Sequence, residues 1–490
     1  MTGFQTATRS VQPLPQATGR HRPGLRHLTG AAALAAAAAL VALPVGDGIV
    51  LGPLTIDRAA LFLATAVLGL SALVQGFAWR YMDGDRDRSG FDRRLGILTL
   101  AALVLAAADH MLAFLGAWVV VALVLPRAIG HARGWGAADA AAALARRSLI
   151  GGTVFLAAGL LLLWLATGGH RFSALAAGGL AAADPMMITL AALAFVAVVV
   201  VQCALPPAHG WLMASMTAPT PVSAFMHAGL VNAGGILMLR TLPVFEAVPA
   251  ATVAAFAMGS LAMLIGAAAS RAQTGVKRGL AASTSAQMGY MTVQAALGFP
   301  GAALAHLVLH GLYKASLFLG AGSALAGAHA PRASVPATAS RLMLAWPAAI
   351  AAGAGFALVT GKLDATLGGR ADTGAILVAI AGLAGLQLAT GVLRTGARTM
   401  VVVLALPVAA LIAGGLYGAV ILIVDALTGV GAAPQPLALH HLLLPVALLM
   451  GWGATALGLD RRAAAAWTFF ATAGRPAATT FSVTKGASHA

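Results

Sequence analysis

Apolar residues fill most of the chain in runs of about 15 to 25 positions, and the short segments between these runs carry nearly all of the charged residues. A transmembrane helix needs about 20 consecutive, mostly apolar residues, so runs of this length can cross a bilayer. The chain is therefore expected to be all-α, a polytopic transmembrane helix bundle of about 13 or 14 spans. The number is 13 if one weak helix is a re-entrant element and not a span. The predicted spans are 29–45, 56–79, 95–108, 110–126, 148–167, 185–204, 221–240, 249–270, 279–298, 302–326, 342–361, 373–393, 399–427 and 442–458.

The composition supports a membrane protein. Hydrophobic residues make up 60% of the 490 positions and charged residues only 9%, with a mean hydropathy of +0.89, which excludes an ordinary soluble domain. The single cysteine, Cys203, excludes a disulfide framework, a multi-cysteine zinc site and an iron–sulfur cluster held by this chain alone. We therefore expect no cofactor and no metal site in this chain.

The net charge of +16 would suggest nucleic acid as a partner for a soluble protein, but orientation in a membrane explains it as well. If the N-terminus is cytoplasmic, the cytoplasmic segments hold 24 of the 30 Lys and Arg residues, the outer segments hold five, and Lys314 lies within the membrane. An excess of Lys and Arg on the cytoplasmic side is the rule for membrane proteins. Both termini are therefore predicted to be cytoplasmic, and no nucleic acid is needed.

Three regions are predicted: a basic cytoplasmic segment at 1–28, a transmembrane domain at 29–462 and a cytoplasmic tail at 463–490. The first region and the apolar run after it mimic a signal peptide, with a basic start followed by an apolar core. We expect a retained first helix because thirteen further apolar segments follow.

The span Ala302–Gly322 carries His306, His310 and Lys314 in an otherwise apolar run. Residues four apart differ by only about 40° around a helix, so the three share one stripe roughly 12 Å long. Such groups are costly in lipid and should face protein or water, which makes them a candidate proton relay. Alternatively, the two histidines only hydrogen-bond between helices. The spans offer Lys314 no obvious carboxylate, so we expect it to be neutral or to meet water, a backbone carbonyl or a partner's acid.

Two further stretches carry polar or helix-breaking residues. Prolines interrupt 201–240, and the helix that ends near Ala204 should stop or break there. Broken helices at membrane depth occur at the ion sites of transporters, although an ordinary loop, with His227 as a packing residue, is the alternative. The stretch 273–290 begins with Lys277 and continues with hydroxyl side chains, which can carry water but more commonly bond to helix carbonyls. The four prolines are Pro206, Pro207, Pro219 and Pro221.

Several motifs in this order resemble the proton-conducting antiporter-like family, which includes the large membrane subunits of respiratory complex I and of multi-subunit sodium/proton antiporters. Within it, HGWL followed by HAGLVNAGG, and AW at 117–118 without a following acid, look most like the B subunits (DabB) of DAB-type inorganic-carbon transporters. The resemblance implies inverted repeats and discontinuous helices. The motifs are IDRAALF at 56–62, WRYMDGD at 79–85, ADHMLAFLGAW at 108–118, HGWLMASMTAPTPVSAFMHAG at 209–229, QTGVKRGLAASTSAQMGY at 273–290 and HLVLHGLYKASLFLGAGS at 306–323.

The resemblance also implies roles for single residues. Gln202 stands where the family usually has a lysine, and Val119 stands where it has that lysine's partner glutamate. Losing both members of an ion pair is physically coherent, since losing one would leave a buried charge unpaired. Lys362 could match a lysine of the second half of the family's channel, although its spacing is shorter. The positions that match ionisable residues of the family's proton path are His227, Lys277, His306, His310 and Lys314.

These features predict a proton-conducting subunit, not an enzyme, in a bacterial inner membrane. In the DAB case the resemblance implies coupling of proton flow to a large soluble partner of the DabA type, similar to zinc-dependent carbonic anhydrases, that hydrates carbon dioxide to bicarbonate. One alternative is a proton-translocating subunit of a complex I-like NADH-quinone oxidoreductase or a multi-subunit cation/proton antiporter. The second is a non-conducting anchor for a partner, which the absent ion pair at Val119 and Gln202 favours.

Overall fold

The computed structural model describes residues 24–44, 48–322, 339–364, 371–395 and 400–456; most of the predicted region 1–28 and all of 463–490 lie outside these ranges. Within them a long helix matches every predicted span, except that one span contains two helices in line, so the all-α prediction is confirmed. The helices are α1 (Gly24–Ala42), α2 (Arg58–Tyr81), α3 (Arg88–Ala107), α4 (Met111–Ile129), α5 (Gly136–Thr167), α7 (Pro185–Gln202), α9 (Thr220–Ala228) with α10 (Ala233–Arg240), α12 (Pro249–Ala272), α13 (Val276–Ala296), α14 (Pro300–Leu319), α15 (Ala339–Thr360), α17 (Gly374–Arg394), α18 (Met400–Thr428) and α19 (Leu439–Ala456).

Short elements connect the long helices. Strands β1 (Ile49–Leu51) and β2 (Leu54–Ile56) form an antiparallel hairpin in which Ile49 pairs with Ile56. The other short elements are α6 (Phe172–Ala174), the π-helical turn η1 (Leu175–Gly179), α8 (Gly210–Ala214), the 3-10 turns η2 (Ser215–Thr217) and η3 (Leu230–Asn232), and α11 (Leu242–Ala247).

Eleven helices of the described chain are long and apolar enough to cross a membrane. Three helices at the positions of predicted spans fall outside this set. In α1 the apolar part is only His27–Ala42, and α3 begins with a charged turn. Helix α13 carries many hydroxyl and amide side chains, of which Thr284, Thr292 and Gln294 are buried. A membrane helix can hold such residues because they face neighbouring helices rather than lipid.

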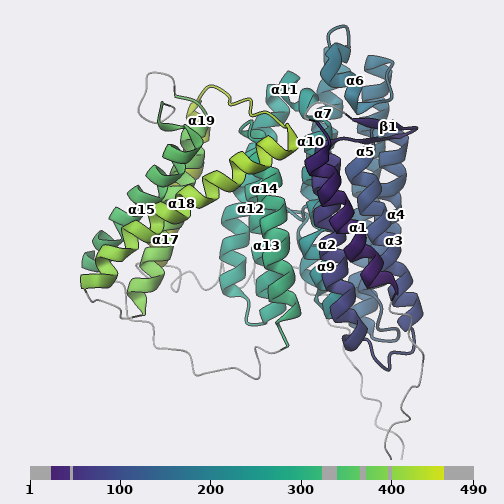
Figure 1. Ribbon diagram of the computed structural model, residues 1–490, viewed down its shortest axis with the longest axis horizontal. Helices are drawn as coiled ribbons and strands as arrows, with labels where there is room; N and C mark the ends of the chain where they lie inside the picture. Colours follow the sequence, from purple (N-terminus) through teal and green to yellow (C-terminus); the bar gives the residue numbers. More distant parts are fainter. Residues whose placement is uncertain (1–23, 45–47, 323–338, 365–370, 396–399, 457–490) are drawn as a thin grey trace, which may run out of the picture.

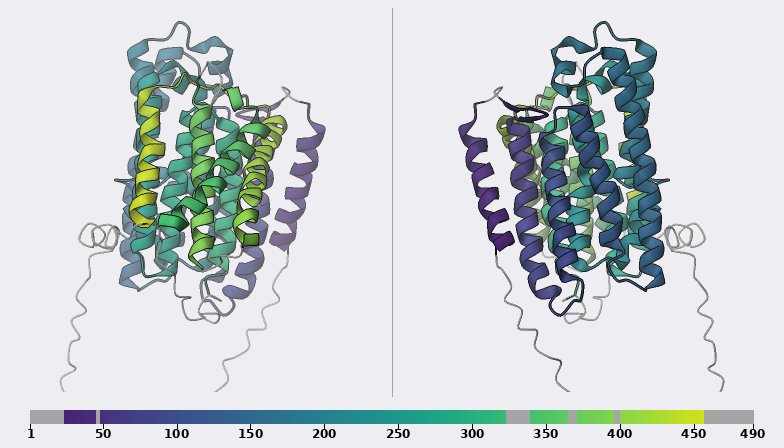
Figure 2. Two further views of the ribbon diagram at one scale, coloured as in Figure 1. Left: turned by 90° about the vertical axis from the view of Figure 1, so that its left-hand side faces the viewer. Right: turned by 90° about the vertical axis from the view of Figure 1, so that its right-hand side faces the viewer.

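The helices run roughly alongside one another, with α1 at the edge of the bundle (Figure 2). Helices α2 to α5 lie on one side, α12 to α14 in the middle, and α15, α17 and α18 on the other side (Figure 1). Helix α18 runs obliquely and contacts both α14 and α2. Its last turn is tied to the start of α2, because Arg58 Nε donates to the carbonyl of Leu427 at 2.6 Å. The long oblique helix thereby joins the two sides of the bundle.

Glycines let the central helices touch backbone to backbone. A Cβ built on Gly259 of α12 would lie 2.7 Å from the carbonyl oxygen of Gly289 on α13, and one on Gly289 would lie 2.5 Å from the carbonyl of Gly259. A Cβ on Gly311 of α14 would lie 2.6 Å from the carbonyl oxygen of Ala228 on α9. Small residues allow this close packing in membrane helices. They hold α12 against α13 and α14 against α9.

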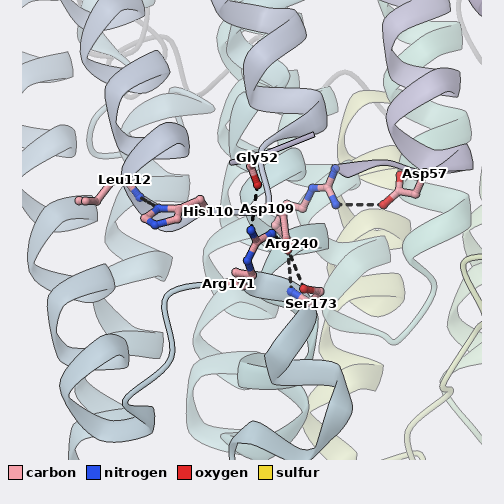
Figure 3. A network of polar contacts seen from close by, with 8 residues as sticks. All are labelled: Gly52, Asp57, Asp109, His110, Leu112, Arg171, Ser173 and Arg240. Atoms are coloured by element: carbon pink, nitrogen blue, oxygen red, sulfur yellow. Dashed lines mark hydrogen bonds and ion pairs between the residues drawn. The ribbon is translucent and has the colours of Figure 1, made fainter. Parts of the chain in front are cut away.

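Asp109, between α3 and α4, is the centre of a polar network at the end of α3 (Figure 3). Its side chain is only 2% exposed and accepts hydrogen bonds from the Arg171 guanidinium at 3.0 Å and from the Ser173 backbone N–H at 2.8 Å and hydroxyl at 2.9 Å. Arg171 also donates to the carbonyl of Gly52 at 2.9 Å. Burial alone would raise the pKa of Asp109, but the bonds from Ser173 and Arg171 outweigh it and hold that pKa below its usual value.

Arg240, at the C-terminus of α10, makes a second connection at the same end (Figure 3). Its guanidinium lies 3.2 Å from the carboxylate of Asp57, the residue that caps the N-terminus of α2, and donates to the carbonyl of Ala106 at the end of α3. One side chain thus joins the end of the interrupted span to two other helices.

We expect Asp109→Asn to destabilise the fold, because the buried Arg171 contact then loses its counter-charge. Hydrogen bonds to charged groups contribute about 1.5–3 kcal/mol each, so the expected loss is about 2–3 kcal/mol of unfolding free energy. Since the folded-state pKa lies below the unfolded value of 3.8, this stabilisation is complete above about pH 4 and is lost as the pH falls through the folded-state pKa. Thermal unfolding in detergent at pH 7 measures the first effect, and a series of measurements at decreasing pH below 4 measures the second.

Asp184→Asn is the matched control. Asp184 is exposed and caps α7 through one bond to the N–H of Met187 at 2.8 Å, and asparagine caps a helix equally well. Equal melting temperatures for Asp109→Asn and Asp184→Asn at pH 7 would contradict the stabilising role of Asp109.

Candidate functional site

The three ionisable residues of α14 lie on one buried face of the helix. His306, His310 and Lys314 are 8%, 4% and 2% exposed, whereas Leu312 and Tyr313 between them are 48% and 61% exposed. The rings of His306 and His310 are stacked, with centroids 5.6 Å apart and planes 17° apart. The stripe that the sequence predicts therefore exists and faces protein.

Lys314 is held by uncharged oxygens of α13. Its Nζ donates to the carbonyl of Leu280 at 3.0 Å and to the hydroxyl of Ser283 at a shorter distance. No carboxylate among the described residues forms an ion pair with it. A backbone carbonyl was one of the partners predicted for Lys314, and the structure has it. The Ser283 hydroxyl is a second partner that was not predicted.

His227, at the end of α9, joins the same carbonyl through Thr284. Its Nδ1 lies 3.1 Å from the hydroxyl of Thr284, which donates to the carbonyl of Leu280 at 2.9 Å. Because that hydroxyl hydrogen is used, Nδ1–H of His227 must donate to Thr284, and Nε2 is then the free acceptor of the neutral ring. The ring is fully buried and stacks on Phe318 with centroids 4.4 Å apart. Residues of α9, α13 and α14 thus meet at Leu280.

Polar side chains continue this line from α14 toward α18. The ring of Tyr290 stands edge-on to His306, with centroids 5.1 Å apart, and its phenol interacts with that of Tyr417 on α18. The amide of Gln294 donates to the Tyr417 hydroxyl at 2.9 Å. No role was predicted from the sequence for these three residues. Tyr290 and Gln294 are one helical turn apart on α13, which is the signal that could have revealed them.

Lys277 lies at the other end of the line, at the start of α13. Its Nζ is 3.4 Å from the carbonyl oxygen of Ala218, just before Pro219. Lys277 and Thr284 are seven positions apart, which is about 10 Å along the helix. The groups from Lys277 to Gln294 therefore extend along most of α13 (Val276–Ala296), a helix of membrane-spanning length. We call His227, Lys277, Thr284, Tyr290, Gln294, His306, His310, Lys314 and Tyr417 the polar seam.

The helix interruption that matters for the seam lies beyond the prolines. Helix α7 ends at Gln202, the cis pair Pro206 and Pro207 follows in the connection, and Pro219 and Pro221 flank the first residue of α9. The four prolines therefore mark the connection between two spans. Inside the second span the helix is broken at Gly229 and η3, directly after His227. This break was not predicted from the sequence.

Side chains from α7 and from the break itself satisfy the carbonyls that it frees. Gln202 donates to the carbonyl of Leu230 at 2.8 Å, and the neighbouring Cys203 donates to that of Val231 at 3.3 Å. Asn232 donates to the carbonyl of Ala228 at 2.8 Å. Gln202 thus supports the broken helix with an uncharged amide. Val119, the other departure from the family pattern, lies partly exposed in α4.

Lys362 is not at the Lys314 end of α14. It follows α15 and its Nζ lies 4.3 Å from the centre of the Phe299 ring, next to the start of α14. Burial lowers the pKa of Lys362, and the nearby carboxylates of Asp372 and Asp425 oppose that shift. It therefore belongs to a separate charged group near the Gln294 end of the seam.

Three imidazole nitrogens of the seam are buried without a hydrogen-bond partner among the described residues: the Nε2 atoms of His227, His306 and His310. Within the same part of the chain, no group of three or more His, Cys, Asp or Glu residues is placed to hold a metal ion. Each of these three nitrogens has a free lone pair that could accept a proton or a hydrogen bond from water.

Comparison with known proteins gives a family and several relatives. Residues 107–348 match the family described as NADH:quinone oxidoreductase/Mrp antiporter, transmembrane. The chain is 35% identical over 298 residues to a probable inorganic carbon transporter subunit DabB of Bacillus anthracis, which covers 60% of this chain and 58% of the relative. It is 32% identical over 341 residues to NADH-quinone oxidoreductase subunit L of Mycobacterium tuberculosis, covering 66% and 53%. The chain thus spans little more than half the length of these relatives.

Solved structures agree on the fold. The Mrp complex from Dietzia sp. DQ12-45-1b matches with a TM-score of 0.61 at 22% identity, covering 89% of this chain and 54% of that one. The membrane-bound sulfane sulfur reductase, an archaeal respiratory membrane complex, matches with a TM-score of 0.56 at 19% identity, covering 92% and 90%. The resemblance that the motifs indicated is therefore confirmed: residues 107–348 of the chain are similar to the membrane subunits of the NADH:quinone oxidoreductase and Mrp antiporter family.

Proposed function

We propose that this chain conducts protons along the polar seam, as the membrane subunit of an energy-coupled inorganic-carbon uptake complex in a bacterial inner membrane. The observation that carries the proposal is the hydrogen-bonded connection from His227 through Thr284 and the Leu280 carbonyl to Lys314. It joins two basic side chains of different helices at one point, and the stacked histidines of α14 continue from there. Buried ionisable residues in membrane spans commonly mark ion and proton pathways.

The proposed path runs from the Gln294 end of the seam to Lys277. A proton enters near Gln294, Tyr417 and Tyr290, passes to His306 and His310, and reaches Lys314 and His227. The ring centres of His306 and His310 are 5.6 Å apart, which exceeds hydrogen-bond reach, so water must bridge successive steps. An unpaired buried imidazole nitrogen costs about 1–3 kcal/mol, so bridging water at the three free Nε2 atoms would also stabilise the seam.

Lys314 suits a transient proton carrier because uncharged oxygens hold it. A carboxylate partner would stabilise its ammonium form strongly, whereas a carbonyl and a hydroxyl leave the proton easier to release. A second proton on His310, one turn away, would repel the charge on Lys314 and drive that release. The same argument applies to His227 across the Leu280 carbonyl.

The carbon-uptake part of the proposal rests on the relatives named as probable inorganic carbon transporter subunits DabB. It includes a large soluble partner of the DabA type that carries zinc and hydrates carbon dioxide. The relatives in NADH-quinone oxidoreductases and the Mrp fold favour a second candidate, a pumping subunit of a complex I-like or antiporter assembly. The third candidate, a non-conducting anchor, is favoured by the neutral Gln202 amide where the family has a lysine.

We expect Lys314→Ala and Lys314→Arg both to lower proton flux at least tenfold in liposomes that contain the chain with its partner. Alanine removes the carrier, whereas arginine keeps the positive charge and the donors but does not release its proton. Both variants should insert into membranes and fail to rescue growth at low carbon dioxide.

Ser316→Ala is the control on the same helix, because Ser316 is exposed and donates only to the carbonyl of Tyr313. It should keep flux within twofold of the wild type. Full flux through Lys314→Arg would show that the charge, not a transferable proton, is needed. Full rescue by Lys314→Ala would remove Lys314 from the mechanism, and no flux through the wild-type complex would favour the anchor.

The partner is tested by affinity purification of the tagged chain from membranes of its own host in mild detergent. We expect one large soluble protein with bound zinc, measured by metal analysis. After reconstitution of the complex into liposomes, we expect carbon dioxide hydration that depends on an imposed proton gradient. The control is a tagged, unrelated inner-membrane protein of the same host. Recovery of quinone-linked subunits and NADH oxidation would instead support the complex I-like candidate.

A further inference from the structure

A cavity of about 300 Å³ lies between α3, α4 and α5, at the end of the bundle where α4 ends and α5 begins. Four arginines and two aspartates line it, so its walls carry a net positive charge. None of these residues belongs to the polar seam. The charged lining residues are Arg94, Arg127, Arg133, Arg146, Asp87 and Asp139.

On the inner wall of this cavity the positive charge of Arg94 is balanced by a carboxylate, and hydrogen bonds hold the side chains in place. Arg94 lies 3.0 Å from the carboxylate of Asp87 and donates to Nδ1 of His131 at 2.8 Å. Since Nδ1 accepts that bond, Nε2–H of His131 donates to Asp85 at 3.1 Å. The hydrogen bond from Arg94 lowers the pKa of Asp87, so this carboxylate stays ionised and balances Arg94.

Two arginines at the rim remain without a counter-charge. Arg127 is at the last turn of α4 and donates only to the carbonyl of Leu123 at 2.6 Å, and Arg146 is on the facing side of α5. Both are exposed, and neither forms an ion pair with a carboxylate of the described chain. Asp139, also in the lining, is exposed in the first turn of α5. Two guanidinium groups on facing helices can bind the oxygens of a phosphate bidentately.

The position of the cavity matches the headgroup level of a membrane. Helix α5 has 32 residues and is about 48 Å long, whereas the hydrocarbon core is about 30 Å thick. Because Asp139, Arg146 and Arg147 are charged and lie in its first turns, we place this end of α5 in the headgroup layer, with Arg146 near the boundary. Apolar residues line the cavity beside the arginines, including Leu123, which is 39% exposed, and Ala143. A ligand with an anionic head and an apolar tail fits both parts of the lining.

We propose that this cavity binds the phosphate of an anionic phospholipid, with Arg127 and Arg146 contacting the phosphate oxygens and Leu123 and Ala143 contacting the first acyl carbons. Inorganic phosphate, which has no acyl tail, would contact only the arginines. Basic pockets between membrane helices are suited to lipid headgroups on general electrostatic grounds. This inference does not depend on proton conduction.

The test compares two double variants that remove the same charge at the same end of the bundle. Arg127→Gln with Arg146→Gln removes the rim arginines, and Arg93→Gln with Arg147→Gln removes exposed neighbours that do not line the cavity. Native mass spectrometry and thermal unfolding are measured with phosphatidylglycerol, phosphatidylcholine and inorganic phosphate. We expect the wild type to bind phosphatidylglycerol at least fivefold more tightly than phosphatidylcholine, the rim variant to lose this preference, and the control variant to stay within twofold of the wild type.

The remaining outcomes overturn the proposal. If the control variant lost the preference for phosphatidylglycerol to the same extent, general surface charge would be what attracts the lipid. Inorganic phosphate that displaces phosphatidylglycerol at equal concentration would assign the cavity to a free anion. No preference for phosphatidylglycerol in the wild type, in protein that elutes as a single species, would leave the cavity to another occupant, such as an acidic surface of a partner protein.

Discussion

The carbonyl oxygen of Leu280 is the contact on which the arrangement of the buried basic groups depends. It accepts from Lys314 and from Thr284, and Thr284 in turn accepts from His227. A basic group at membrane depth needs a hydrogen-bond acceptor, and a carboxylate would bind its proton tightly. A backbone carbonyl satisfies the group and stays uncharged. Lys314 is therefore buried with a hydrogen-bond partner that does not hold it in the protonated form.

The contact requires three helices to approach closely, and the packing provides this. Gly311 lets α14 touch α9 at Ala228, next to His227, and Gly259 and Gly289 join α12 to α13. The break after His227 ends α9 within the bundle, so that this side chain lies at the end of a helix. A larger residue at Gly311 would separate α14 from α9 and with them Lys314 from His227. Small residues and a broken helix are therefore part of the site.

Much of this could be predicted from the sequence, because the governing patterns are local. Lengths of apolar runs gave the fourteen helix positions, and spacing by four gave the buried stripe of His306, His310 and Lys314. The break at Gly229 was missed because glycine is common in membrane helices, whereas the prolines nearby were the more obvious helix breakers. Tyr417 was missed because its neighbours, Tyr290 and Gln294, lie more than 120 residues away in the chain. Contacts between residues so far apart in the chain leave no pattern in the local sequence.

The two departures from the family pattern follow from the same constraint on buried charge. A lysine at position 202 would add a second buried ammonium group to the bundle, and the valine at position 119 could not balance its charge. Gln202 donates to the Leu230 carbonyl of the broken helix, a bond that a neutral amide makes without needing a counter-charge. The valine at position 119 then leaves no carboxylate unpaired. In this chain the α7 side of the interrupted span therefore supplies a neutral hydrogen bond, and the proposed proton path lies on the side that faces α13 and α14.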